Sequence, residues 1–389
     1  MNLAAIQEEL QKQQLDGWLF FDHHQRDPLA YRVLGFQPAS HVTRRWYYWI
    51  PSSGQPRGLV HRIESGRLDS LPGDKIRYSS WSEQTGGLRS LLGGARRVAM
   101  QYSPLCAIPY VSMVDAGTVE LVRSLGVEVL SSAELIQHFE ARWNAAALES
   151  HLEAGRRVDR VRAQAFEMVR EITRDGRAVQ EFTVAQFVRD GFAKAGLFAE
   201  DGPIVGVNAN AANPHYEPTA AITSEIRSGD LVLLDMWAKL SRPGAVYYDI
   251  TWTGFCGDRP SDHMREVYAV VSGARDAAIA RVKDAVAARQ ELHGYEVDDA
   301  ARGYISSRGY GDAFVHRTGH SIGEDVHGNG ANMDNLETHD ERRIVPWTCF
   351  SIEPGVYLKD FGIRSEVNMF VGEKDARVTG EIQQELLIL

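Results

Sequence analysis

Cysteine is scarce in this sequence. The 389 residues include three, Cys106, Cys256 and Cys349, an odd number that is too small to cross-link a chain of this length. We therefore expect no structural disulfides, as is usual for proteins of a reducing compartment.

Positive charge is also in short supply. Lys and Arg number 42 against 52 Asp and Glu, so the formal net charge is -10. Nucleic-acid surfaces need clustered basic residues, so this balance argues against a nucleic-acid partner and favours a small substrate. The first 17 residues lack the basic and apolar regions of an export signal, and no apolar run is long enough to cross a bilayer. We predict a cytoplasmic protein with no membrane partner.

What is present is an ordinary globular composition, 44% hydrophobic and 24% charged, in a chain long enough for roughly two to three domains. The N-terminal part alternates helix-like and strand-like segments, which predicts an α/β domain over 1–135. Its helices are predicted at 3–15 and 113–125, and its strands at 17–21, 46–50, 98–102 and 127–130.

A helical pattern then runs from 139 to 173 without clean heptads, so we interpret 136–175 as a segment connecting two domains and disfavour a coiled coil. The remainder, 176–389, mixes elements in an order that is not strictly βαβ, which predicts an α+β domain with a largely antiparallel sheet. Its helices are predicted at 182–195 and 262–288, and its strands at 231–236, 246–253, 349–358 and 363–371.

Two aspartates stand on adjoining predicted strands of this second domain. Asp235 closes the apolar run 231–234, and Asp249 lies in the alternating run 247–254, with a turn signal at 241–244 between them. A strand-end Asp can simply cap a turn. If the two carboxylates face each other on a hairpin, however, a cation between them would relieve their repulsion.

Two glutamates repeat this arrangement near the C-terminus. Glu353 follows the strand-like run 349–352 and precedes a Pro-Gly turn, and Glu366 lies in the run 362–370. Positions 353 and 366 are 13 apart, and positions 235 and 249 are 14 apart. Period-two alternation places Arg364, Glu366 and Asn368 on one face. The spacing predicts an internal duplication in which each half donates two carboxylates.

Three histidines, His316, His320 and His327, lie within twelve residues between these pairs. A lone histidine is more often a structural hydrogen-bonding group, but a cluster favours a metal site. Four carboxylates with one or two histidines suit Mn²⁺, with Co²⁺ or Zn²⁺ as alternatives. The set is large enough for two cations sharing a bridging water, which predicts metal-assisted hydrolysis.

At these residues the sequence resembles the pita-bread metallopeptidases, which include methionine aminopeptidase, Xaa-Pro aminopeptidase and Xaa-Pro dipeptidase (prolidase). The resemblance covers essentially the whole chain and implies an N-terminal α/β domain of the creatinase/prolidase type before an α+β pita-bread catalytic domain with pseudo-twofold duplication. LLDMW, YYDITWTG, TGHSIG, SIEPG and GIRSE match the ordered ligand motifs. The ligands that it implies for two divalent cations are Asp235, Asp249, His320, Glu353 and Glu366.

The resemblance also implies roles for neighbouring residues. Asp249 and Glu366 would bridge both cations, and Glu353 would shuttle a proton. His215 in ANPHYEP is similar to a histidine that contacts the substrate, and His327 to one that stabilises the tetrahedral intermediate. The remaining two, His316 and Arg364, resemble catalytic residues typical of the proline-specific branch, in which the arginine orients the site, and Arg364 is also expected to bind substrate. Homodimers are usual in that branch.

The sequence departs from the family pattern at several places. Trp347 stands where Gly229 stands in the other half, and a tryptophan adopts positive φ only at a cost, so we expect a different turn there. GIRSEV is also unusual around the last ligand. A substrate-binding arginine is expected near 338–343, where His339 would take its place.

The predicted function is hydrolysis of Xaa-Pro dipeptides by attack of a metal-bridging hydroxide, on a small peptide with proline at its second position. A Xaa-Pro aminopeptidase acting on longer peptides is the alternative. A metal-independent hydrolase resembling creatinase, or a binding module without activity, would be expected to lack part of the ligand set.

Overall fold

The computed structural model describes residues 1–36 and 41–389, which form two compact units, Met1–Glu140 and Ala141–Leu389. The division falls after Glu140, beyond the expected position 135. Most of the segment expected to connect the domains is the helix α6 (Ala145–Arg174), which belongs to the second unit. Its apolar face explains this difference, because Ala154, Val158 and Phe166 are buried in a core shared with that unit's strands.

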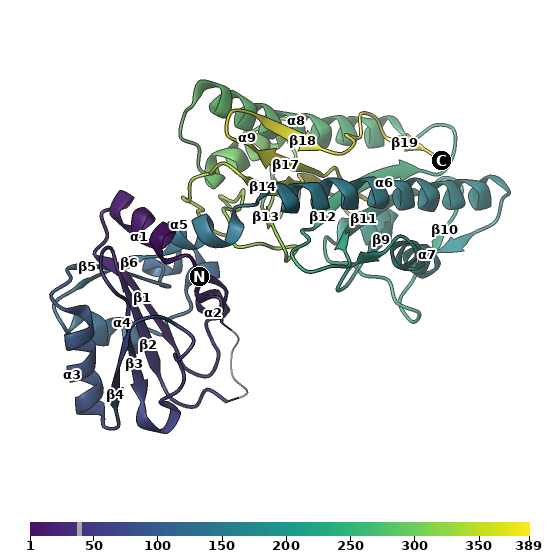
Figure 1. Cartoon of the computed structure of the whole chain (residues 1–389). Helices are drawn as coiled ribbons and strands as arrows, with labels where there is room; N and C mark the ends of the chain where they lie inside the picture. Colours follow the sequence, from purple (N-terminus) through teal and green to yellow (C-terminus); the bar gives the residue numbers. More distant parts are fainter. Residues whose placement is uncertain (37–40) are drawn as a thin grey trace. The chain divides into compact units, whose positions relative to one another are not determined.

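The first unit is built on a six-stranded mixed sheet in the order β4-β3-β2-β1-β5-β6 (Figure 1). Alternate residues of β1 face different cores, with Trp18 and Phe20 in one and Leu19 and Phe21 in the other. Both faces of the sheet are therefore covered. The strands are β1 (Gly17–Asp22), β2 (Trp46–Pro51), β3 (Arg57–His61), β4 (Asp74–Tyr78), β5 (Arg97–Met100) and β6 (Glu128–Ser131).

Four helices of this unit begin at side-chain caps, as Asn2, Asp27, Ser80 and Asp115 each accept a backbone N–H of the first turn. The helices are α1 (Leu3–Lys12), α2 (Pro28–Leu34), α3 (Trp81–Leu92), α4 (Ala116–Arg123) and α5 (Ala133–Ile136). Sequence patterns predicted α1, α4 and four of the strands, and missed the region from 52 to 97 because β3 and β4 are short and carry Gly and charged residues.

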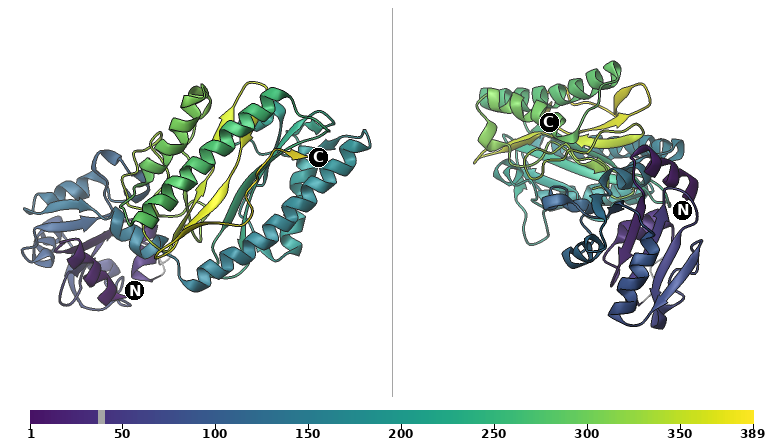
Figure 2. Two further views of the ribbon diagram at one scale, coloured as in Figure 1. Left: turned by 90° about the horizontal axis from the view of Figure 1, so that it is seen from above. Right: turned by 90° about the vertical axis from the view of Figure 1, so that its left-hand side faces the viewer.

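The second unit repeats one arrangement twice, as predicted. Helices α6 and α7 (Glu181–Lys194) precede the antiparallel pair β11 (Leu231–Leu240) and β12 (Tyr248–Phe255). Helices α8 (Asp262–Ala288) and α9 (Gly294–Ser307) precede the antiparallel pair β14 (Thr348–Ile352) and β17 (Val367–Val371). Figure 2 shows the long helices α6 and α8 from two further directions.

Shorter strands extend both pairs. The pair β11–β12 is joined by β8 (Leu197–Phe198), β9 (Ile204–Val207) and β19 (Leu387–Ile388), and the pair β14–β17 by β13 (Ser321–Ile322) and β18 (Ala376–Thr379). Two separate two-stranded sheets are formed by β7 (Val179–Gln180) with β10 (Glu225–Ile226) and by β15 (Gly355–Tyr357) with β16 (Gly362–Arg364). The resulting sheets have the orders β19-β12-β11-β8, with β9 also on β11, and β13-β14-β17-β18. The C-terminal strand β19 thereby pairs with β12 of the first half, and the two run parallel.

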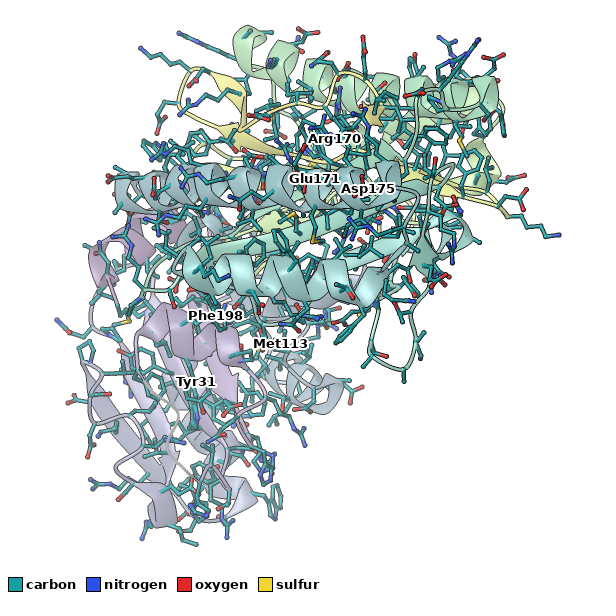
Figure 3. The ribbon with its side chains drawn as sticks, turned by 90° about the vertical axis from the view of Figure 1, so that its right-hand side faces the viewer. Tyr31, Met113, Arg170, Glu171, Asp175 and Phe198 are labelled. Carbon is teal, nitrogen blue, oxygen red and sulfur yellow. The ribbon has the colours of Figure 1, made fainter. Side chains whose placement is uncertain are left out.

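Each long helix covers the strands of its own half. Residues of α6 share a core with β11 and β12, and residues of α8 share another with β14 and β17. The opposite side of α6 is polar, and Figure 3 labels Arg170, Glu171 and Asp175 at its C-terminal end. No helix in the described parts of the chain is both long and apolar enough to span a membrane.

Candidate metal centre

The first two predicted ligands lie on one face of the β11–β12 hairpin. Asp235 pairs in register with Thr251, and Asp249 pairs with Trp237. The two aspartates are therefore diagonal neighbours and do not face each other directly, which corrects the expected pairing. Residues two apart on a strand share a face, so all four side chains still lie on the same side.

The second two predicted ligands, Glu353 and Glu366, lie just outside the strands β14 and β17 of the other half. Glu353 follows β14, and its N–H donates to the carbonyl of Thr318 at 2.7 Å. Glu366 precedes β17, and its N–H donates to the carbonyl of Thr251 on β12 at 3.1 Å. Asn368 also bridges the halves, accepting from the N–H of Asp249 at 3.1 Å and donating to its carbonyl at 2.8 Å. The two hairpins are thus locked together at the carboxylates.

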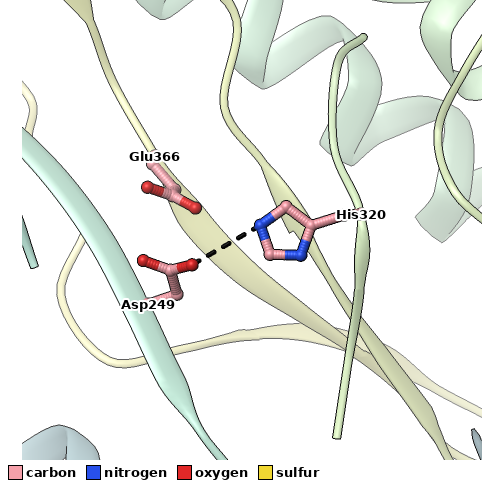
Figure 4. A group of neighbouring side chains, drawn as sticks. All are labelled: Asp249, His320 and Glu366. Carbon is pink, nitrogen blue, oxygen red and sulfur yellow. Dashed lines mark ion pairs between the residues drawn. The ribbon is translucent and has the colours of Figure 1, made fainter. Parts of the chain in front are cut away.

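The imidazole of His320 completes the cluster (Figure 4). One ligand atom from each of Asp249, His320 and Glu366 lies within 4.8 Å of the others. Nε2 of His320 is 3.5 Å from Oδ2 of Asp249 and 3.4 Å from Oε1 of Glu353. Nδ1 lies 3.2 Å from the carbonyl of Ser321, which favours the Nδ1–H tautomer and leaves the Nε2 lone pair directed at the carboxylates.

Glycine before this histidine is required by close packing. A Cβ at Gly319 would lie 1.9 Å from the carbonyl oxygen of Ser351. The segment carrying His320 therefore lies directly against β14, and the N–H of His320 donates to the Ser351 hydroxyl at 2.9 Å.

The carboxylates are buried and incompletely hydrogen-bonded. Oδ1 of Asp235, Oδ1 of Asp249 and Oε1 of Glu366 are buried and have no hydrogen-bond partner among the described residues. Burial first, and the neighbouring carboxylates next, raise the pKa of Asp249 and Glu366 well above the ordinary range. Burial also raises the pKa of Asp235 to about 7, against the opposing charge of Arg364. These unpaired oxygens, together with one imidazole, are a donor set that fits divalent cations.

A hydrogen-bonded chain runs from Asp235 to His316. Arg364 donates through Nη2 to Oδ2 of Asp235 at 2.5 Å and through Nη1 to the Tyr357 hydroxyl at 3.1 Å. That hydroxyl lies 2.6 Å from Nε2 of His316, whose Nδ1 lies 2.7 Å from the carbonyl of Arg317. Burial lowers the pKa of His316 to about 4, so the ring is neutral and accepts from Tyr357.

Tyr357 was not among the predicted site residues. It ends the three-residue strand β15, four positions after Glu353, and a lone aromatic there shows no pattern in the sequence. The only sequence signal was its place two residues after the Pro-Gly turn that follows a proposed ligand.

The other predicted histidines lie at exposed positions. The ring of His327 is 4.4 Å from that of His320. His215 lies in the loop after β9, where its N–H donates to Oδ1 of Asn213 at 3.1 Å. His339 lies 2.8 Å from Oδ1 of Asn335, and its described contacts include none of the proposed ligands.

Trp347 corrects the expectation of a different turn. Its φ is +66°, the same sign as the +97° of Gly229 in the other half. The strain is offset by hydrogen bonds on both sides of the residue, from its N–H to the carbonyl of Val371 at 2.7 Å and to its carbonyl from the N–H of Trp143 at 2.6 Å. Its indole also donates to Glu373 at 3.0 Å.

An ion pair on α9, between Asp298 and Arg302, holds the segment that leads from His316 to His320. The sequence analysis did not predict it. Arg302 donates to both oxygens of Asp298 at 2.7 and 2.9 Å, and to the carbonyl of His316 at 2.8 Å. Thr318 donates its N–H and hydroxyl to Oδ1 of Asp298 at 2.9 and 2.7 Å. Because the Thr318 carbonyl also accepts from the N–H of Glu353, Asp298 supports this proposed ligand and the segment that leads to His320. An acid and a base four apart on a helix were the available signal.

Comparison with known sequences identifies the family. Residues 149–373, more than half of the chain, match metallopeptidase family M24. The chain belongs to this family. It is therefore a hydrolase of the metal-dependent peptidases, and the predicted pita-bread fold is confirmed.

Individual relatives agree with this assignment. The metallopeptidase is 28% identical over 346 residues to a protein of Mycobacterium bovis named probable dipeptidase PepE, covering 87% of this chain and 84% of that one. It is 36% identical over 164 residues to a Xaa-Pro dipeptidase of Lactobacillus helveticus, covering 42% and 40%. Its fold matches the crystal structure of dipeptidase PepE from Mycobacterium ulcerans with a TM-score of 0.70 and 25% identity, over 99% and 96% of the two chains.

Proposed function

We propose that this metallopeptidase is a Xaa-Pro dipeptidase that holds two divalent cations, of which Mn²⁺ is favoured, through Asp235, Asp249, His320, Glu353 and Glu366. The observation that carries the proposal is the buried set of unpartnered carboxylate oxygens around the His320 imidazole. The family of the chain and the Xaa-Pro dipeptidase among its relatives support the substrate class.

When bound, two such cations supply a water of lowered pKa and polarise the peptide carbonyl. Glu353 accepts the proton of the attacking water and passes it to the imide nitrogen of proline as the bond breaks. His327, beside His320, donates a hydrogen bond to the oxygen that becomes negative.

The chain from Arg364 through Tyr357 to His316 orients the site. Arg364 holds Asp235 in one rotamer and, with His316, fixes the Tyr357 hydroxyl between them. The Tyr357 hydroxyl donates to His316, whose own N–H donates to the carbonyl of Arg317. Both residues therefore act by fixing Arg364 and Asp235, without competing for the cations. His215 and His339 are proposed to contact the substrate from the exposed rim.

We propose that His339, and not the neighbouring Arg342, recognises the carboxylate of the substrate. Arg342 is buried, and it donates to both oxygens of Asp340 and to the carbonyl of Asn329. Its guanidinium is therefore engaged, whereas His339 is exposed. Replacing His339 by Ala is expected to raise KM for a dipeptide with little change in kcat. An unchanged KM would remove His339 from the substrate site.

The deciding experiment compares a Xaa-Pro dipeptide with a Xaa-Pro-Xaa tripeptide, each assayed with Mn²⁺. Cleavage of the dipeptide is expected, and cleavage of the tripeptide alone would favour the Xaa-Pro aminopeptidase alternative. Activity that survives complete chelation would contradict metal dependence. Gel filtration with light scattering tests the proposed homodimer, and cell fractionation tests the proposed cytoplasmic location.

A further inference from the structure

An aspartate outside the proposed ligand set lies on the same side of the sheet as the metal centre. Trp237 pairs directly with Asp249, so its indole leaves β11 on the face that carries Asp235 and Asp249. Side chains directly opposite on antiparallel strands have Cβ atoms about 5 Å apart. The indole Nε1 donates to Oδ1 of Asp201 at 3.0 Å.

The position of this aspartate is fixed by the packing of its own loop. A Cβ at Gly202 would lie 2.6 Å from the Trp237 ring, so the backbone after Asp201 lies flat against the indole. Trp237 and Val326 pack against the same apolar cluster. Through its hydrogen bond to the indole, Asp201 is therefore held on the side of β11 and β12 that carries the proposed bridging ligand Asp249.

Asp201 is itself exposed, and only its Oδ1 is used in the hydrogen bonds given for the described residues. A second carboxylate oxygen thus remains for a cation entering from solvent.

We propose that Asp201, held by the Trp237 indole, is a specificity-determining residue that binds the ammonium group of the substrate's N-terminal residue. This inference rests on the proposed function. It adds which chemical group of the substrate is recognised on the residue before the scissile bond. A substrate ammonium approaching two divalent cations is repelled by them. A carboxylate beside the cations, but not ligating them, offsets that repulsion and selects peptides with a free amino terminus.

The ammonium could be the α-amino group or the side chain of an N-terminal lysine, and kinetics separate the two. Ala-Pro, Lys-Pro and propionyl-proline, which lacks the ammonium, are assayed with the Mn²⁺-loaded protein and its Asp201→Asn variant. Loss of a hydrogen bond to a charged group raises KM about tenfold or more. We expect this rise for Ala-Pro, with kcat little changed and propionyl-proline unaffected.

A rise in KM confined to Lys-Pro would assign Asp201 to the side-chain ammonium. An Asp258→Asn variant, at an exposed position after β12, serves as the matched control for loss of one negative charge. If the KM values of Asp201→Asn for Ala-Pro, Lys-Pro and propionyl-proline stand in the same ratios as those of the unsubstituted protein, the proposal is overturned.

A binding measurement keeps this inference separate from the proposed function. L-alaninol carries an ammonium and is not a peptide, and 1-propanol is its counterpart without the amine. In calorimetric titrations of the Mn²⁺-loaded protein, Asp201→Asn is expected to weaken L-alaninol binding about tenfold and to leave 1-propanol unchanged. That result together with no cleavage of any Xaa-Pro peptide would refute the proposed function alone. Equal L-alaninol binding by both proteins would refute the ammonium site.

Discussion

Several carboxylates of this protein are buried, and burial destabilises their ionised forms. In the proposed centre, three buried carboxylate oxygens have no hydrogen-bond partner among the described residues, and each ionised carboxylate is destabilised by the others. Apolar runs followed by an acid are visible in the sequence, so Asp235 and Glu353 could be predicted as site residues, although β11 continues past Asp235 to Leu240. The diagonal placement of Asp235 and Asp249 could not, because it depends on the register set by the connection at 241–247.

Replacing Asp249 by Asn should affect activity and stability in opposite directions. Activity and bound metal, measured by elemental analysis, are expected to fall to background. In chelator, the variant should unfold at a higher temperature than the unsubstituted protein. The raised pKa of Asp249 means that its stabilising protonated form is present at low pH and is lost as pH rises, so the gap should widen above about pH 4. A lower melting temperature at pH 8 in chelator would contradict this.

A second carboxylate of this kind lies in the first unit. Burial raises the pKa of Asp27 to about 7, although its Oδ1 caps α2 by accepting the N–H of Ala30. Its contribution to stability is complete below the unfolded-state pKa of about 4 and is lost as pH rises through 7. Asp27→Asn keeps the cap, so it should stabilise the protein by on the order of 1 kcal/mol at pH 8 and by little at pH 4. Denaturant unfolding at both pH values measures this, and an equal effect at the two would rule out the titration.

At the scale of elements, turns and helix faces position the chemistry. The conformation at Trp347 shows where sequence reasoning fails, since residue preference disfavours positive φ but hydrogen bonds from two neighbouring segments enforce it. Tyr357 was missed for a related reason. Its role arises from a contact with Arg364 across the short β15–β16 pair and not from any local pattern.

The turn before β14 can be tested with a matched pair of variants. Trp347→Gly and Trp347→Ala both remove the indole and its hydrogen bond to Glu373. Glycine adopts φ near +66° without strain, so the Gly variant should be more stable than the Ala variant by about 1 kcal/mol. Chemical denaturation gives the difference, and an Ala variant of equal or greater stability would mean that the turn changes conformation.

The ion pair on α9 predicts an effect on metal affinity. Asp298→Asn removes a charge that holds Thr318 and Arg302, so the carbonyl that accepts from Glu353 loses its support. We expect the dissociation constant for Mn²⁺ to rise about tenfold or more, measured by calorimetry. Asp299→Asn, which changes the adjacent exposed acid, is the control and should bind as the unsubstituted protein does. Equal affinity in both variants would limit Asp298 to a role in folding.

For the whole molecule, the buried residues form separate cores in the two units, and all proposed ligands lie in the second. Metal that binds only the folded second unit should stabilise that unit alone, by about 2.7 kcal/mol at a free concentration of one hundred times Kd. Scanning calorimetry with and without Mn²⁺ is therefore expected to shift one of two transitions. A shift of both by the same amount would show that the units unfold together.

The pairing of β19 with β12 also bears on the order in which a ribosome delivers this chain. Glu366 emerges 117 residues after Asp249, and Gln383, later still, exchanges hydrogen bonds of 3.0 and 2.6 Å with Thr253 of the hairpin that carries the aspartates. During synthesis Asp235 and Asp249 are therefore translated before Glu353 and Glu366. We expect nascent chains to remain metal-free until translation of the second half is complete.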